Sequence, residues 1–198
     1  MPEDTTYIQQ LITKSNRVET YAGKTGVNDF KYLDGEFVSP EVPYHIIYQN
    51  DGKEIYVTEV DFDEKLIYGI ARHTINNKGF DTIIFDTKYL EIEKVTVGNI
   101  DSEKEVKFFL GPWDKDSIIG QPLYIITDPA YKKINIYYQT TNKSIALDWL
   151  EKNQTEGKKQ PFLYTQGEPI LTRSWIPIQD SPGNRITYSA TVKVPSHL

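Results

Sequence analysis

The chain has 198 residues, a formal net charge of −6 at pH 7 and no cysteine. This length allows one domain with a substantial core, or at most two small ones. The absence of cysteine excludes disulfides and thiolate metal sites, and it suits either redox compartment. The 22 Lys and Arg residues are scattered, with no run longer than two, so neither nucleic acid nor an anionic membrane is an expected partner.

The first residues, Met-Pro-Glu-Asp, lead into no apolar run. A signal peptide or a membrane span is therefore not expected within this sequence. A cytoplasmic location is the default expectation, and an exported chain whose leader had been removed would look the same.

Residues 1–43 differ in pattern from the rest of the chain. Between residues 4 and 15, apolar side chains recur at helical spacing behind Asp4 and Thr5, which predicts a short amphipathic helix. Residues 16–43 are polar and contain glycine, which favours a long loop or an extended wrapping segment. We therefore expect residues 1–43 to be an amino-terminal extension and residues 44–198 to form one β-domain.

The remaining chain is rich in Tyr, Phe, Ile, Val and Thr, with frequent turn residues, and this composition favours strands. Strands are predicted at residues 44–49, 54–62, 66–75, 82–85, 90–97, 106–110, 123–126, 134–139, 162–165 and 185–194. Asn50-Asp-Gly52 and Asp63-Glu-Lys65 predict hairpin turns, and the apolar spacing predicts a bulge between residues 92 and 95. Residues 144–150 predict one or two helical turns with Ser144 as N-cap. The predicted class is mostly β, with one or two short helices and sandwich-like strand spacing.

The histidines give no metal-binding pattern. His45, His73 and His197 are the only three, and no His-Glu-x-x-His spacing occurs. A three-ligand zinc site would need all three to converge, so none is expected in this chain. Patterns of serine hydrolases, P-loop NTPases and dinucleotide-binding enzymes are also absent.

Paired carboxylates are frequent, but their setting is polar. The pairs are Asp61 with Asp63, Glu91 with Glu93, Glu103 with Glu105 and Asp114 with Asp116. Alternate positions share one face of a strand, so a glycosidase-type pair is conceivable. Each pair stands in a Lys-rich segment, and we interpret all four as solvated surface. Trp113 and Trp149 lie beside turn or helix signals and are interpreted as packing residues.

Candidate binding residues are densest in residues 161–182. Gly167 and Pro169 end the strand predicted at 162–165, which leaves Gln166 and Glu168 at a strand end. Side chains there can be aimed into a cleft by a rigid scaffold. On spacing alone, two polar residues in a surface turn are more simply explained as structure.

A resemblance to a known family favours a binding role for Gln166 and Glu168 over a purely structural one. Thr165-Gln-Gly-Glu-Pro169, Arg173 and Pro177-Ile-Gln-Asp-Ser-Pro182 resemble the Thr-Gln-x-Glu, Arg, Pro-Cys-x-Asp-x-Pro signature of the zinc aminopeptidases related to aminopeptidase N and leukotriene A4 hydrolase. Further matches to the leukotriene A4 hydrolase branch follow the same order in both, at residues 85–95, 144–150 and 154–158. The resemblance covers about residues 57 to 198. The sequence departs from the signature at Ile178, where the family often has cysteine, and carries Glu168 where that branch can have glutamine.

The resemblance implies a fold and a role. It implies the amino-terminal domain of these enzymes, a saddle-like sandwich of mixed β-sheets. Glu168 would reach into the active-site cleft and pair with the free α-ammonium of a peptide substrate, with Gln166 and Gly167 in the same binding turn. Arg173 and Asp180 would be structural support behind that turn.

The same resemblance places the chemistry outside this chain. Zinc and every catalytic residue would belong to the catalytic domain of a longer parent, the second expected partner after the peptide. The glutamate favours plain peptidase activity over epoxide hydrolysis. The alternative is a free-standing β-sandwich interaction module without activity, and the downstream sequence would decide between the two.

Overall fold

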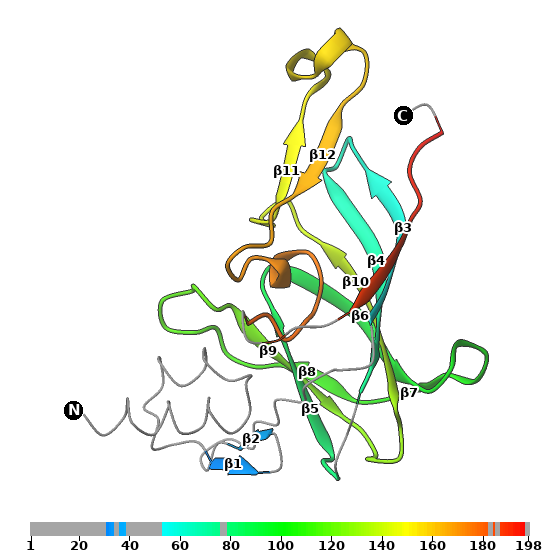
Figure 1. Ribbon diagram of the computed structural model, residues 1–198, viewed down its shortest axis with the longest axis vertical. Helices are drawn as coiled ribbons and strands as arrows, with labels where there is room; N and C mark the ends of the chain where they lie inside the picture. The colour runs from blue at the N-terminus through cyan, green and yellow to red at the C-terminus, as the bar shows by residue number, and fades with distance from the viewer. Residues whose placement is uncertain are drawn as a thin grey trace.

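The structure is a computed structural model that describes residues 31–33, 36–38, 53–75, 79–181, 184 and 187–196. Within these residues the strands form four sheets (Figure 1). The largest is mixed: its first two strands run parallel and all its other pairs are antiparallel. In sheet order its strands are β13 (Tyr188–Val192), β3 (Lys53–Asp61), β4 (Leu66–Thr74), β10 (Lys133–Thr140), β6 (Leu90–Val97) and β7 (Lys104–Glu105).

The other three sheets are small and antiparallel. The three-stranded sheet contains β5 (Thr82–Thr87), β9 (Gln121–Ile126) and β8 (Phe108–Leu110) in that order. Two hairpins complete the set: β1 (Lys31–Leu33) with β2 (Glu36–Val38), and β11 (Leu147–Leu150) with β12 (Phe162–Thr165). Short 3₁₀ helices are η2 (Ile100–Ser102), η3 (Lys152–Gln154), η4 (Glu156–Lys158) and η5 (Thr172–Ser174). No helix in the described part of the chain is long and apolar enough to cross a membrane.

The core lies between the six-stranded and three-stranded sheets. In β4 every second residue is buried, because alternate side chains of a strand point to opposite faces. The imidazole of His73 on β4 packs on the ring of Phe85 on β5, with 4.3 Å between the ring centroids. The most deeply buried apolar side chains are Phe85, Ile75, Ile83, Leu123, Ile125, Ile134, Ile136, Ile176 and Val95. Full burial of one such aliphatic or aromatic side chain stabilises a fold by about 1.5–3 kcal/mol.

The mostly-β class is confirmed, and so are several local predictions. The Asp63-Glu-Lys65 turn joins β3 to β4, and the Asp61 carboxylate accepts hydrogen bonds from the backbone N–H groups of Asp63 and Glu64. The predicted bulge is present at Glu93: Tyr137 pairs with Lys94 while Tyr138 pairs with Ile92. An extra residue on one strand leaves the ladder register shifted in this way.

Three local predictions were wrong. Residues 144–150 form a turn followed by strand β11, because pairing with β12 outweighs a weak local helix preference. The final predicted strand is limited to β13, whose side chains are exposed along its whole length instead of alternating. Residues 16–43, predicted as a long loop or an extended wrapping segment, contain the β1–β2 hairpin, which was not predicted. The predicted helix at 4–15 and the predicted strand at 44–49 lie outside the described residues, and the boundary at residue 43 stays a prediction.

Candidate functional site

The candidate turn follows the β11–β12 hairpin. The last strand pair, Leu147 with Thr165, is extended by a 2.9 Å hydrogen bond from the N–H of Gln166 to the carbonyl of Ala146. The chain then turns through residues 168–171, and the N–H of Leu171 donates to the carbonyl of Gly167 at 2.7 Å. Gln166 and Glu168 are therefore presented at the end of a paired strand, as the sequence predicts.

Gly167 allows this turn to close. A Cβ atom at this position would lie 2.4 Å from Oγ1 of Thr172, closer than a real contact allows. The peptide bond from Glu168 to Pro169 is cis. The absence of a side chain at Gly167 thus lets the turn pack on η5.

The side chains of Gln166 and Glu168 are exposed. Neither makes a hydrogen bond or an ion pair with another residue in the described part of the chain. An exposed carboxylate held on an ordered turn is available to a cationic group of a partner molecule.

The residues behind the turn are buried and closely connected. We call residues 172–180 the supporting loop. The backbone N–H of Arg173 donates to a carboxylate oxygen of Asp180 at 2.9 Å, and its guanidinium contacts the same carboxylate, the Asp180 carbonyl and the Ile119 carbonyl. The guanidinium also lies 3.5 Å from the carboxylate of Asp86 on β5. One buried cation therefore faces two carboxylates.

This arrangement affects the acid–base behaviour of Asp180. Burial raises the pKa of its carboxyl above the ordinary value of 3.8, and the negative charge of Asp86 adds to the rise. The N–H and the guanidinium of Arg173 act in the opposite direction. Removal of water is the larger effect because it disfavours the charged form of an acid.

Further hydrogen bonds join the supporting loop to β5 and to the hairpin. Ile178 exchanges two backbone hydrogen bonds with Asp86, and the Asp180 N–H donates to the Asp86 carboxylate at 2.8 Å. The Ser174 hydroxyl donates to the Leu171 carbonyl and accepts from the Ala146 N–H. The turn that carries Glu168 thus lies between the hairpin on one side and the supporting loop on the other, and hydrogen bonds join that loop to β5 and to the hairpin.

Asp86 and Ser174 were missed as supporting residues from the sequence. Asp86 lies within the 85–95 match, and its distance along the chain from Arg173 hid the pairing. In three of the carboxylate pairs one member has a structural partner: Glu91 accepts a hydrogen bond from Gln139, Glu103 from Tyr137, and Asp114 from the backbone of its own loop. Trp149 packs against the core and stands edge-on to the ring of Phe62. Trp113 is 40% exposed, and the centroid of its ring lies 5.2 Å from that of Tyr89.

No group of three or more His, Cys, Asp or Glu side chains that could hold a metal ion occurs among the described residues. His73 is buried in the core. His45 and His197 lie outside the described residues. The described donor set therefore does not fit a zinc centre.

Comparisons with known proteins identify similar sequences. Residues 50–198 match the family model of the peptidase M1 N-terminal domain. The chain is 32% identical to leucine aminopeptidase 2-2 of Scheffersomyces stipitis over 80% of its length and 25% of that protein. It is 36% identical to leukotriene A-4 hydrolase of Xenopus laevis over 70% of its length and 23% of that protein.

Solved structures show the same fold. Yeast LTA4 hydrolase in complex with bestatin superposes with a TM-score of 0.62 at 24% identity, over 87% of this chain and 24% of that one. An M1 zinc metallopeptidase mutant from Deinococcus radiodurans gives a TM-score of 0.52 at 13% identity, over 77% of this chain and 33% of that one. The chain spans about a quarter of the length of the curated relatives it matches.

Proposed function

Because the chain belongs to the M1 peptidases, whose N-terminal domain it matches, we propose that it is the amino-terminal domain of a zinc aminopeptidase and that Glu168 binds the substrate α-amine. One observation carries the second part of this proposal. Glu168 is an exposed carboxylate on an ordered turn, in the part of the chain that resembles the family signature.

The physical basis is charge. A carboxylate and a peptide ammonium form a charge-assisted hydrogen bond, which is shorter and stronger than a neutral one. Gln166 stands two residues earlier in the same turn and offers an amide to the first residues of the substrate. Binding the amine at a fixed place selects peptides with a free amino terminus and sets the position of the first peptide bond.

Catalysis belongs to another part of the proposed parent. The relatives and structural neighbours include leucine aminopeptidases and zinc metallopeptidases. The described residues offer no zinc site, so we propose that the metal is held by the catalytic domain that accompanies this domain. The contribution of this chain is then an amine anchor and one wall of the cleft.

Glu168→Gln in the full-length parent tests the anchor. The change keeps the volume and removes the charge, and losing one partner of such a pair costs about 2–5 kcal/mol in a partly desolvated cleft. We expect kcat/KM for an aminoacyl-arylamide to fall by roughly thirtyfold or more, which corresponds to about 2 kcal/mol. The measurement is a steady-state assay of the two purified enzymes.

Two controls make the result specific. Glu105→Gln removes an exposed carboxylate from β7, at the opposite edge of the large sheet from β13, and should leave kcat/KM unchanged. An amino-terminally acetylated peptide should be a poor substrate for the wild type and for the Glu168→Gln variant alike. Unaltered kinetics of Glu168→Gln would contradict the assignment of Glu168 as the amine anchor.

A further inference from the structure

The hydroxyl of Ser174 makes hydrogen bonds in three directions. Ser174 is completely buried and lies in η5, behind the candidate turn. Its hydroxyl donates to the carbonyl of Leu171 at 2.7 Å, and it accepts from the backbone N–H of Ala146 at 3.0 Å and from the hydroxyl of Ser144 at 3.2 Å. A serine hydroxyl has one donor and two acceptor positions, so all three are used.

Two of these hydrogen bonds close a ring around the candidate turn. From the Ser174 hydroxyl the ring passes through the N–H and the carbonyl of Ala146, and this carbonyl accepts from the N–H of Gln166 at 2.9 Å. The carbonyl of Gly167 then accepts from the N–H of Leu171 at 2.7 Å, and the Leu171 carbonyl accepts from the Ser174 hydroxyl. One side chain therefore completes a ring whose other members are all backbone groups.

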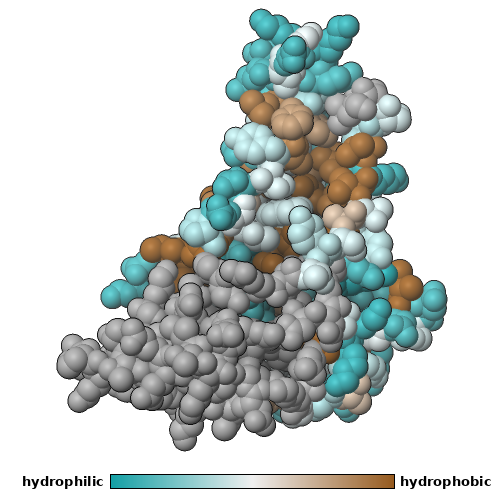
Figure 2. All heavy atoms as spheres, in the orientation of Figure 1, coloured by the Kyte–Doolittle hydropathy of each residue, from teal (hydrophilic) through white to brown (hydrophobic). Residues whose placement is uncertain are grey.

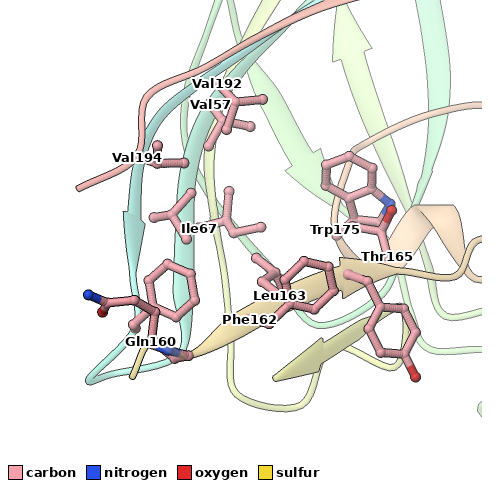
Figure 3. Close-up of a pocket in the computed structure, with 13 residues that line it drawn as sticks. Val57, Ile67, Gln160, Phe162, Leu163, Thr165, Trp175, Val192 and Val194 are labelled. Carbon is pink, nitrogen blue, oxygen red and sulfur yellow. The ribbon is translucent and has the colours of Figure 1, made fainter. Parts of the chain in front are cut away.

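The ring lies at the base of the hairpin that leads into the turn. Among the described strands, β11 and β12 pair only with each other. In the space-filling view their hairpin projects from the rest of the molecule and has a hydrophilic tip (Figure 2). Thr165, the last residue of β12, and Trp175, the residue after Ser174, line the same groove (Figure 3). Ser174 thus joins the base of a projecting hairpin to the supporting loop.

The position of the Glu168 carboxylate depends on the backbone of the turn. Its side chain is exposed and makes no hydrogen bond or ion pair with another residue in the described part of the chain. No neighbouring side chain in that part of the chain therefore holds the carboxylate in place. A displacement of about 1 Å at a group that places the substrate can lower the rate of an enzyme about a hundredfold.

We propose that Ser174 is a positioning residue: its hydroxyl holds the turn where the Glu168 carboxylate meets the α-ammonium of the substrate. This inference rests on the proposed function. Ser174 itself is buried, so it acts through the backbone of the turn and does not contact the substrate.

Ser174→Ala in the full-length parent removes the hydroxyl and leaves the buried N–H of Ala146 without its partner, which is unfavourable. Without the closed ring the turn no longer fixes Glu168. We expect kcat/KM for an aminoacyl-arylamide to fall about tenfold, with a raised KM. A loss of folded enzyme would lower the apparent kcat and leave KM unaltered, so a steady-state assay separates the two effects.

Ser144→Ala is the matched control. It removes a hydrogen bond to the same hydroxyl, from a donor that is not a member of the ring. We expect kcat/KM of this variant to stay within about twofold of the wild-type value. A loss as large as that of Ser174→Ala, or an unaltered KM in Ser174→Ala, would overturn the proposal.

A double-mutant cycle shows whether Ser174 acts through Glu168. In the Glu168→Gln background, Ser174→Ala should have almost no further effect on kcat/KM, because residues that act as one unit are not additive. The same loss in both backgrounds would refute the positioning role and leave the amine anchor in place. Unaltered kinetics of Glu168→Gln itself would instead contradict the proposed function.

Hydrogen exchange in the 198-residue chain tests the ring without using activity. In Ser174→Ala, the amides of Gln166 and Leu171 should exchange roughly tenfold faster, whereas amides in the middle of β4 should keep their rates. NMR spectroscopy measures both sets. Unaltered exchange of the two amides would mean that Ser174 does not hold the turn, and equal acceleration in β4 would mean that it supports the whole fold. Either result would overturn the proposal.

Discussion

Arg173 joins three segments that are far apart in the sequence. It is 2% exposed, and its hydrogen bonds reach the supporting loop and the carbonyl of Ile119, while its charge faces Asp86 on β5. A buried charge is tolerated only when it is paired and its donors are satisfied. The ordered position of the Glu168 turn therefore depends on a side chain that does not itself face the solvent.

Removing this cation should be costly. Arg173→Met leaves the carboxylates of Asp86 and Asp180 without their buried partner, and breaking a pair of this kind typically costs about 3–5 kcal/mol. We expect a correspondingly lower urea midpoint for the 198-residue chain. The exposed pair of Lys65 with Glu151, at 2.8 Å, gives the comparison: Lys65→Met should leave the midpoint nearly unchanged.

The loss in Arg173→Met should depend on pH. The pKa of Asp180 is already raised, and removing the guanidinium raises it further. An acid with a raised folded-state pKa favours the folded protein at low pH, and this contribution is lost as the pH rises through that pKa. The difference in the free energy of unfolding between the wild type and Arg173→Met should therefore become smaller as the pH is lowered from about 7 to about 4. A difference that stays constant would mean that Asp180 is not the stranded charge.

The element that the sequence described least well is β11. Its residues carry no strong helix preference, and the helix prediction depended on a local signal, Ser144 as a candidate N-cap. In the structure, Ala146 donates to Ser174 and accepts from Gln166, and Leu147 pairs with Thr165. These partners lie about twenty to thirty residues away in the sequence, so no local pattern could identify them.

The loop between β8 and β9 contains a glycine, Gly120, that lies close to the backbone of another segment. Gly120 has a φ of +94°, and a Cβ atom there would lie 2.3 Å from the Thr87 carbonyl oxygen. Lys88 follows Thr87 in the chain, and its ammonium donates hydrogen bonds to the carbonyls of Ser117 and Ile118. This loop can therefore reach the end of β5 only with glycine at that point.

Gly120→Ala should destabilise the domain more than an equally strained glycine elsewhere. Gly79 has a φ of +109° with nothing within 4 Å of its added Cβ, so Gly79→Ala has the backbone penalty of about 1–2 kcal/mol without the clash. We expect Gly120→Ala to cost about 2 kcal/mol more and to melt roughly 4–8 °C lower, measured by circular dichroism. Equal melting temperatures would show that the loop can move away from Thr87.

Most of the elements, and the residues of the candidate turn, could be predicted from the sequence. Alternating apolar and polar residues predicted β4, the residues of the Asp63–Lys65 turn predicted the β3–β4 hairpin, and a break in the spacing of apolar residues predicted the bulge at Glu93. Contacts between segments that are far apart in the sequence could not be predicted. Asp86 has no local signal for its partnership with Arg173.

At the scale of the whole molecule, residues 1–43 remain a predicted extension. Among the described strands, β1 and β2 pair only with each other, while β3 to β13 make up the two larger sheets and the β11–β12 hairpin. Among the residues whose burial the structure describes, the large core cluster is built from Ile55 onward. The domain boundary predicted from composition therefore has a direct test.

A chain that begins at residue 44 should fold without the extension. We expect one cooperative thermal transition and a circular dichroism spectrum typical of β-sheet, because the core cluster is retained. The full 198-residue chain is the control. An insoluble product, or one with a broad non-cooperative melt, would show that residues 1–43 complete the core.

The parallel pairing of β13 with β3 has a consequence for synthesis on the ribosome. β3 pairs with β4, the next strand in the chain, but among the described strands its other edge has no partner until Tyr188–Val192 leave the exit tunnel. During that interval the nascent chain exposes an open strand edge, the feature most prone to pairing with other chains. The order of strands thus makes one edge of β3 wait for a partner that is translated more than 120 residues later.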